Sequence, residues 1–143
     1  MFKKITILLL LIANITGMYA QSPSDVVGKW EGTDYDNNPS ELIFIEDSFV
    51  SFTINGETLG GENFSINGQK AALKYFIDSL KNPFWIDFIV YSRAENIEKG
   101  RNKGVLKFID IDNVQIAISF DGNRTSNFGE DNKESIITMR RIN

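Results

Sequence analysis

The chain has 143 residues and a net charge of −4, and it contains no Cys and no His. Its negative charge argues against nonspecific binding to nucleic acid or anionic membranes, because such binding needs clustered Lys and Arg. Without Cys there are no disulfides, and without His the side chain most used for acid–base catalysis and transition-metal binding near neutral pH is missing. We therefore expect one domain that is stabilised by its core alone.

Residues 1–20 have the pattern of a removable export signal. Lys3 and Lys4 give the segment a positive start, Ile5 to Ala13 form an apolar stretch with one Thr, and Gly17-Met18-Tyr19-Ala20 offers a cleavage site. The apolar stretch is too short for a permanent membrane helix, and no Cys follows it that could carry a lipid anchor. We expect cleavage near Ala20, export to the periplasm or the extracellular space, no stable membrane insertion, and one domain over residues 21–143.

Most segments of that domain alternate polar and apolar residues and are rich in β-branched and aromatic side chains, which predicts β-strands. A helical turn over residues 22–27, capped by Ser24 or Asp25, precedes the first strand. Short connections rich in Asn and Gly predict tight hairpin turns, because these residues tolerate positive φ angles. The predicted strands are Gly28–Tyr35, Glu41–Ile45, Phe49–Ile54, Thr58–Ile66, Lys70–Ile77, Phe84–Tyr91, Gly104–Ile111, Val114–Phe120 and Glu134–Arg141.

Eight or nine short strands joined by hairpins indicate an all-β, antiparallel up-and-down barrel with a short N-terminal helical turn. Hairpin connections place consecutive strands side by side, which favours a barrel over a Greek-key sandwich. Closure also removes strand edges that would otherwise promote aggregation. We expect this barrel to be monomeric.

The predicted strand Phe84–Tyr91 does not alternate cleanly, because both of its faces are largely apolar. One interpretation is a strand covered on both faces, either by a partner or by the N-terminal segment. The sequence leaves open which of the two faces points inward.

Two short motifs stand at the ends of the predicted barrel: Gly28-Lys29-Trp30 in its first strand and Arg140-Arg141 in its last. Between them lie further pieces in a fixed order: Asn82-Pro83-Phe84-Trp85-Ile86-Asp87, Gly104-Val105-Leu106-Lys107-Phe108, Asp112-Asn113 and Arg124-Thr125-Ser126-Asn127-Phe128. In this order and spacing the chain resembles small secreted bacterial lipocalin-like (calycin) domains of the planctomycete and Bacteroidetes type.

The resemblance covers most of the span from Val27 to Arg141. Two departures stand out: an Arg-Pro pair is expected where Arg124-Thr125 stands, and residues 36–66 carry little that aligns. The resemblance implies a lipocalin-like barrel whose closed end holds Gly28 and Trp30, with the indole packed against Arg140 or Arg141. It implies no common activity.

Two groups of acidic and amide residues invite a metal-binding interpretation. Asp34, Asp36 and Asn38 have the opening spacing of a calcium loop, but Pro39 stands where Gly belongs and Ile45 where a bidentate Glu belongs. A Pro-containing turn explains this segment better, and a hairpin turn explains the acidic residues at 110–113. We therefore predict no metal site and no cofactor.

Asp87 is the acid most open to a functional interpretation. If it points inward and is desolvated, its pKa rises and it can bind a polar ligand group or a cation. If it points outward, it is a surface carboxylate or a partner of Lys74 or Arg93. Downstream, Ala94–Gly104 has mixed charges and two glycines, which is typical of a solvated loop or of a lid over a barrel mouth.

No nucleophile elbow is present, and no spacing selects two carboxylates for glycosidase-like hydrolysis, so a non-enzyme is expected, with a carboxylate-based hydrolase as the remaining catalytic alternative. The leading hypothesis is an exported barrel that binds a small apolar or amphipathic molecule through Phe52, Tyr75, Asp87 and Phe108. The alternative is a barrel filled by its own side chains that acts through its surface. Large residues at most inward positions would favour this alternative.

Overall fold

The alternating segments of the sequence form ten strands in the computed structural model, which describes residues 21–143. Three short 3₁₀ helices accompany them: η1 (Pro23–Val26), η2 (Glu46–Ser48) and η3 (Glu130–Ser135). The strands are β1 (Gly28–Thr33), β2 (Pro39–Ile45), β3 (Phe49–Ile54), β4 (Glu57–Gly60), β5 (Phe64–Ile66), β6 (Gln69–Asp78), β7 (Phe84–Ser92), β8 (Ile97–Asp110), β9 (Asn113–Ser119) and β10 (Ile136–Ile142).

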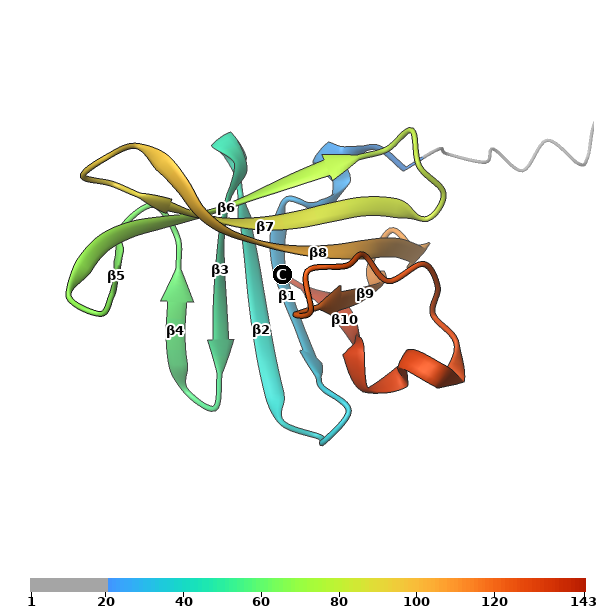
Figure 1. Cartoon of the computed structure of the whole chain (residues 1–143). Helices are drawn as coiled ribbons and strands as arrows, with labels where there is room; N and C mark the ends of the chain where they lie inside the picture. Colours follow the sequence, from blue (N-terminus) through green and yellow to red (C-terminus); the bar gives the residue numbers. More distant parts are fainter. Residues whose placement is uncertain (1–20) are drawn as a thin grey trace, which may run out of the picture.

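The strands form one antiparallel sheet in the order β4-β3-β2-β1-β10-β9-β8-β7-β6-β5, which closes where β3 also pairs with β6 (Figure 1). Eight strands thus make a ring, and β4 and β5 extend beyond the seam. Phe49 lies opposite Lys74 at this seam. Beside them the Gly61 N–H donates to the Val50 carbonyl at 2.7 Å, and the Gly61 carbonyl accepts from the Leu73 N–H at 2.9 Å. The predicted all-β antiparallel barrel is confirmed.

Apolar side chains from all eight ring strands fill the interior. Each large side chain buried in this way stabilises the fold by about 1.5–3 kcal/mol. Half-buried apolar residues, among them Phe52, Tyr75 and Phe108, pack against this core. The buried core residues are Val26, Trp30, Leu42, Phe44, Val50, Leu73, Ile86, Phe88, Leu106, Val114, Ile116, Ile118 and Met139.

The two apolar faces of β7 have different surroundings. Phe84, Ile86, Phe88 and Val90 point inward and join the core, so the alternate residues of the strand point outward. Part of the outer cover comes from residues 120–135, which we call the strap; it connects β9 to β10 and is orange-red in Figure 1. This part of the cover therefore comes from the C-terminal part of the domain.

The strap shields outward-facing residues of β8 and β9. Val105 and Ala117 lie opposite each other on these strands, and both are buried. Phe128 of the strap lies under the Lys107 ammonium group, which is 4.9 Å from the ring centre. A second, smaller apolar layer thus forms outside the barrel wall.

Two predicted segments are wrong in detail. Thr58–Ile66 is not one strand, because Gly60 and Gly61 take positive φ angles of 104° and 79° and break it into β4 and β5. Ala94–Gly104 is not a loop or a lid: β8 begins at Ile97 and pairs with β7 along this stretch. Its charged side chains therefore lie on a paired strand.

The predicted N-terminal turn is present as η1, but its cap differs from the expectation. Ser22 is the N-cap residue, and its N–H donates to Asp25 Oδ2 at 2.7 Å. The turn brings Val26 into the core, where the Val26 carbonyl accepts a 2.8 Å hydrogen bond from the Trp30 indole. The segment therefore covers the closed end of the barrel.

Candidate functional site

The closed end is formed by Trp30 and Arg141. Trp30 is fully buried, and the Arg141 guanidinium carbon lies 4.3 Å from the centre of its ring. Arg141 donates to the carbonyls of Val27 at 2.9 Å, Asp25 at 2.6 Å and Ile111 at 3.1 Å. The guanidinium thus ties the N-terminal turn to the β8–β9 hairpin, which is a structural role.

Arg140, the other predicted partner of Trp30, points to the opposite side of β10 and pairs with Glu31. Gly28 is needed for the contact with Arg141: its φ is 134°, and an added Cβ would lie 2.9 Å from Arg141 Nη1. Gly28, Trp30 and Arg141 therefore form one unit, and Arg140 is not part of it.

The predicted ligand residues Phe52, Tyr75 and Phe108 lie in or beside the core, and each packs against other aromatic rings. Ring centres are 5.1 Å apart for Phe52 and Phe88, and 4.9 Å apart for Tyr75 and Phe44. Phe108 meets Trp30 and Phe84 at 6.5 Å and 6.4 Å. Edge-to-face pairs of this kind contribute about 0.5–1.5 kcal/mol each beyond the buried area. These rings therefore fill the barrel.

Tyr75 has one polar contact in this environment: its hydroxyl donates to the Ile45 carbonyl at 3.4 Å. Burial raises the pKa of the Tyr75 phenol, because the charged phenolate is poorly solvated there. The hydroxyl is therefore a neutral donor at neutral pH.

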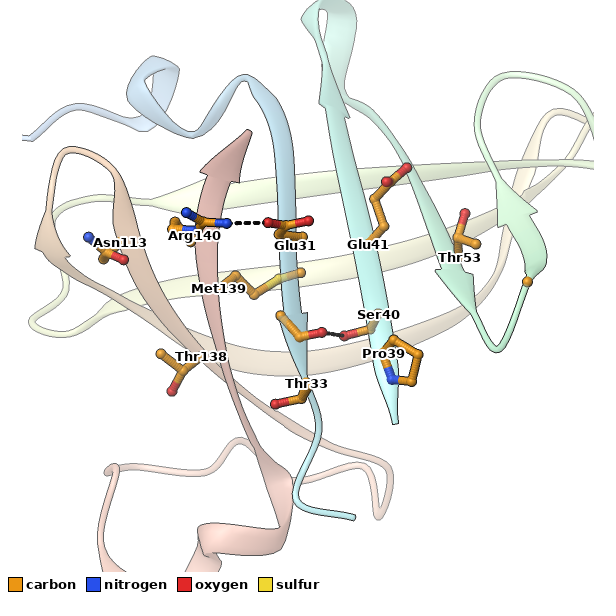
Figure 2. A pocket seen from close by; sticks show the side chains of 12 residues that line it. Glu31, Thr33, Pro39, Ser40, Glu41, Thr53, Asn113, Thr138, Met139 and Arg140 are labelled. Atoms are coloured by element: carbon orange, nitrogen blue, oxygen red, sulfur yellow. Dashed lines mark hydrogen bonds and ion pairs between the residues drawn. The ribbon is translucent and has the colours of Figure 1, made fainter. Parts of the chain in front are cut away.

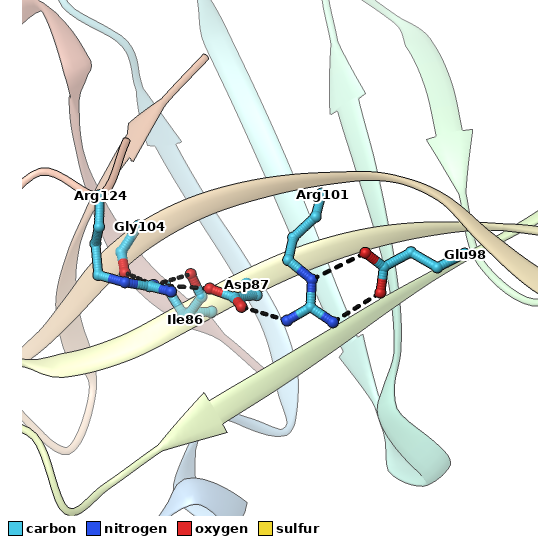
Figure 3. A network of polar contacts seen from close by, with 6 residues as sticks. All are labelled: Ile86, Asp87, Glu98, Arg101, Gly104 and Arg124. Carbon is cyan, nitrogen blue, oxygen red and sulfur yellow. Dashed lines mark hydrogen bonds and ion pairs between the residues drawn. The ribbon is translucent and has the colours of Figure 1, made fainter. Parts of the chain in front are cut away.

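Asp87 does not belong with these three residues, because it lies on the outer face of β7 (Figure 3). It is nevertheless buried, with only 5% of its surface exposed. Oδ2 accepts a 2.6 Å hydrogen bond from Arg101 Nη1, and Oδ1 forms a 2.7 Å ion pair with Arg124 Nη1. Of the two interpretations left open, the inward one is wrong, and in the outward one the partners are Arg101 and Arg124 in place of Lys74 or Arg93.

Each arginine of this network has a further acceptor. Arg101 donates from Nε and Nη2 to the two carboxylate oxygens of Glu98, at 3.2 Å and 2.7 Å. This pairing lowers the pKa of Glu98 and raises that of Arg101. Arg124 donates to the Gly104 carbonyl at 2.8 Å, and its guanidinium carbon lies 4.3 Å from the centre of the Trp85 ring.

Two guanidinium groups thus occupy the Asp87 carboxylate, which leaves it poorly placed to act as a free base or as a cation ligand. Arg124 comes from the strap, whereas Asp87, Arg101 and Trp85 come from the barrel wall. The network therefore holds the strap against β7 and β8.

A separate hollow of about 650 Å³ lies on the outer side of β1, β2, β3, β9 and β10 (Figure 2). Its walls combine three threonines with charged residues that are already paired: Glu31 with Arg140, and Glu41 with Lys29 at 3.4 Å. The lining residues are Glu31, Gly32, Thr33, Pro39, Ser40, Glu41, Thr53, Gly56, Asn113, Thr138, Met139 and Arg140.

The sequence predicts neither this hollow nor the arginines of the Asp87 network. The hollow draws on five strands, and only the strand register shows that Glu41, Glu31 and Arg140 are consecutive neighbours across the sheet. For Arg101, the signal available in the sequence is the short spacing of opposite charges at 98 and 101, in a segment predicted to be a loop.

The acidic turns are structural. Asp34 Oδ1 accepts the Asn38 N–H at 2.8 Å, and Asp110 Oδ1 accepts the Asp112 N–H at 2.8 Å. Among residues 21–143, no group of three or more Asp or Glu side chains is placed to hold a metal ion. Within the same residues, no helix has the length and apolar character needed to cross a membrane.

Comparison of the chain with models of protein families, with curated proteins and with solved structures gives no match.

Proposed function

We propose that this chain is a non-catalytic binding protein in which the barrel is a solid scaffold and the outer surface binds the partner. The filled interior carries this proposal. Inward positions on all eight ring strands hold apolar side chains in mutual contact. An eight-stranded barrel is just wide enough to be filled in this way, and a ligand in its centre would have to displace packed side chains.

The state of the acidic groups supports the non-catalytic part of the proposal. Asp87 is neutralised by two arginines, and the two acids of the hollow, Glu31 and Glu41, are each paired with a base. A general base must be free to take a proton from a substrate. Carboxylates already held by arginine or lysine are poor candidates for that role.

Kinship with lipocalin-like domains, export and a monomeric state belong to the same proposal. The packing of Trp30 against Arg141 supports the kinship, because the resemblance implies this contact at the closed end. The leader-like segment 1–20, which motivates export, lies outside the residues that the structure describes.

A lipophilic dye whose fluorescence rises in apolar surroundings tests the proposal. We expect no saturable enhancement with the unmodified protein. Phe88→Ala is the positive control, because Phe88 is buried against Phe44 and Phe52 and its truncation leaves an apolar cavity that a dye can enter. Saturable binding to the unmodified protein that a fatty acid displaces would contradict a solid barrel.

A second candidate function is the capture of a small apolar or amphipathic molecule at the open end. A hollow of about 340 Å³ beside the β3–β4 hairpin favours it, because exposed Ile54 and Leu59 adjoin the half-buried Phe52 there. Leu59→Ser separates this function from binding inside the barrel. Dye binding that disappears in Leu59→Ser supports the second candidate, whereas dye binding that persists indicates the interior.

A further inference from the structure

Charge is distributed unevenly around the barrel wall. Residues 21–66, which include β1 to β5, contain nine acidic residues and one basic residue, Lys29. Residues 69–107, which include β6, β7 and most of β8, contain eight basic and four acidic residues. In the ring, β9 and β10 separate the two halves on one side and the β3–β6 seam separates them on the other. The domain therefore has an acidic half and a basic half, although its total charge is negative.

The basic half also exposes aromatic rings. On the outer face of the sheet Phe76 lies opposite Asp87, and Trp85 occupies the next outward position on β7. Phe76 is 57% exposed and Trp85 is 40% exposed. We define the basic aromatic face by these two rings and the cations around them: Lys74, Phe76, Lys81, Trp85, Arg101 and Lys103.

The register and the cation contacts place these residues together. Lys103 lies opposite Asp87 on β8, next to the Phe76–Asp87 pair, and Arg101 lies opposite Ile89. Lys81 Nζ is 4.6 Å from the centre of the Trp85 ring, and Lys74 Nζ is 4.8 Å from that of Tyr91. The cations and the exposed rings thus share one continuous patch on β6, β7, β8 and the β6–β7 connection.

Most of the negative charge on this face is internally neutralised. Asp87 is paired with Arg101 and Arg124, and Glu98 is paired with Arg101. Across residues 21–143, the ion pairs found do not involve Lys74, Lys81 or Lys103. These three ammonium groups are therefore available to a negatively charged partner.

We infer that the basic aromatic face is a docking site for an acidic surface of another protein. The inference rests on the proposed function, since it assigns the surface that binds. The lysines would steer an acidic partner towards the face. Exposed aromatic rings need an apolar counterpart, which a protein surface supplies and a polyanion such as a sulfated polysaccharide does not. Buried aromatic anchors inside a polar rim are the usual source of binding energy in protein interfaces.

The test uses the protein from residue 21 onward and a random copolymer of Glu and Tyr as the acidic polypeptide probe, with binding measured by titration calorimetry at low and moderate salt. We expect saturable binding that weakens as salt rises. In the variants Phe76→Ser, Lys81→Glu and Lys103→Glu, the Kd should rise about tenfold each, which corresponds to about 1.4 kcal/mol.

Matched controls come from the other half of the barrel. Tyr35→Ser removes an aromatic side chain that is 47% exposed, compared with 57% for Phe76, and Lys29→Glu makes the same charge change as Lys103→Glu. Both controls should leave the Kd within about twofold of the original value, since they lie outside the proposed face. Thermal melting of every variant verifies the fold.

Four results would overturn the inference. The first is absence of copolymer binding, and the second is equal weakening of binding in the control variants. The third is heparin binding that is as tight as copolymer binding and insensitive to Phe76→Ser. The fourth is self-association of the protein that Lys103→Glu removes. The last two results would assign the face to a polysaccharide or to a second copy of this chain. The dye assay tests whether the barrel interior is filled, and the copolymer titration tests whether the basic aromatic face binds. The two proposals can therefore fail independently of each other.

Discussion

The Arg141 guanidinium stacks on the Trp30 indole at 4.3 Å, while the next residue back along β10, Arg140, lies on the other side of the strand. Strand alternation explains the difference, because Met139 and Arg141 share the inward face of β10 and Arg140 faces outward. Two adjacent arginines thus have unrelated roles, which makes them a natural pair for mutation.

Trp30→Ala should destabilise the protein by about 3–5 kcal/mol, the usual cost of truncating a buried aromatic side chain. The variant also loses the indole hydrogen bond to the Val26 carbonyl. Thermal and urea denaturation measure the effect, and the melting temperature should fall by roughly 10 °C or more. A melting curve that matches the original protein would contradict the closed-end role of Trp30.

Arg141→Ala should cost about 2–3 kcal/mol, because the variant loses the stacking on Trp30 and leaves backbone carbonyls without their donor. Arg140→Ala should cost at most about 1 kcal/mol, because an exposed ion pair contributes little. Urea denaturation of both variants under identical conditions gives the comparison. Equal losses would show that the two arginines do not have the different roles described.

Asp87→Ala should destabilise the protein by about 2–3 kcal/mol, because the guanidinium groups of Arg101 and Arg124 lose a buried partner. The cost stays at this level because the side chain of Arg101 is 33% exposed and water can solvate it. The change should also release the strap, so amide hydrogen exchange should become faster in residues 120–135. Arg124→Ala should reproduce the faster exchange, whereas Arg101→Ala should leave it nearly unchanged. Uniformly faster exchange over the whole barrel would argue against a local anchoring role.

Gly104→Ala and Gly100→Ala test close packing between strands at two positions of β8. A Cβ at Gly104 would overlap the backbone carbonyl of Ala117, whereas a Cβ at Gly100 would meet nothing within 4 Å. Gly104→Ala should therefore lower the melting temperature by several degrees. Gly100→Ala should leave stability unchanged or raise it by up to about 1 kcal/mol. If Gly100→Ala destabilised the protein, the open space beside Gly100 on the paired strand β8 would be contradicted.

Acid should weaken the fold through carboxylates that are hydrogen-bonded in the native state. The Asn113 side chain lowers the pKa of Asp110 below its ordinary value of 3.8, and Arg101 lowers that of Glu98 below 4.5. A group whose pKa is lowered by folding contributes stability above its ordinary pKa and loses it as pH falls through the folded value. The melting temperature should hold from pH 7 to about pH 5 and decline below about pH 4.

The variant Asn113→Ala isolates one of these contributions. An NMR titration should show the pKa of Asp110 moving up towards 3.8, with the pKa of Glu98 unchanged. An unmoved Asp110 would mean that Asn113 is not the cause of the lowered value.

The barrel could be predicted from the sequence because its evidence is local. Alternation and short Asn-Gly connections report on neighbouring residues, and they place Phe49–Ile54 and most other strand bounds within a few positions. The contact between Trp30 and an arginine was likewise expected from the family resemblance. Side chains alternate between the two faces of a strand, so Arg141 lies on the same face of β10 as the apolar Met139. This alternation predicts Arg141, and not Arg140, as the partner of Trp30.

The Asp87 network could not be predicted, because its partners come from different elements. Arg101 falls in a predicted loop, since Gly100 and a run of mixed charges are also typical of solvated segments. Arg124 reaches Asp87 only through the path of the strap, which no periodic pattern encodes. The hollow beside Glu31 and Arg140 depends on the register of several strands in the same way.

The seam at Phe49 and Lys74, where β3 meets β6, determines where the barrel opens first. One residue pair and the two hydrogen bonds of Gly61 join β3 to β6 there, whereas β7 is paired with β6 and β8 along nearly its whole length. Thermal fluctuations should break the weakest strand pairing, that between β3 and β6, first. The earliest excursion from the native state is then a local gap between β3 and β6, and it stays narrow because only three residues of chain link β4 to β5.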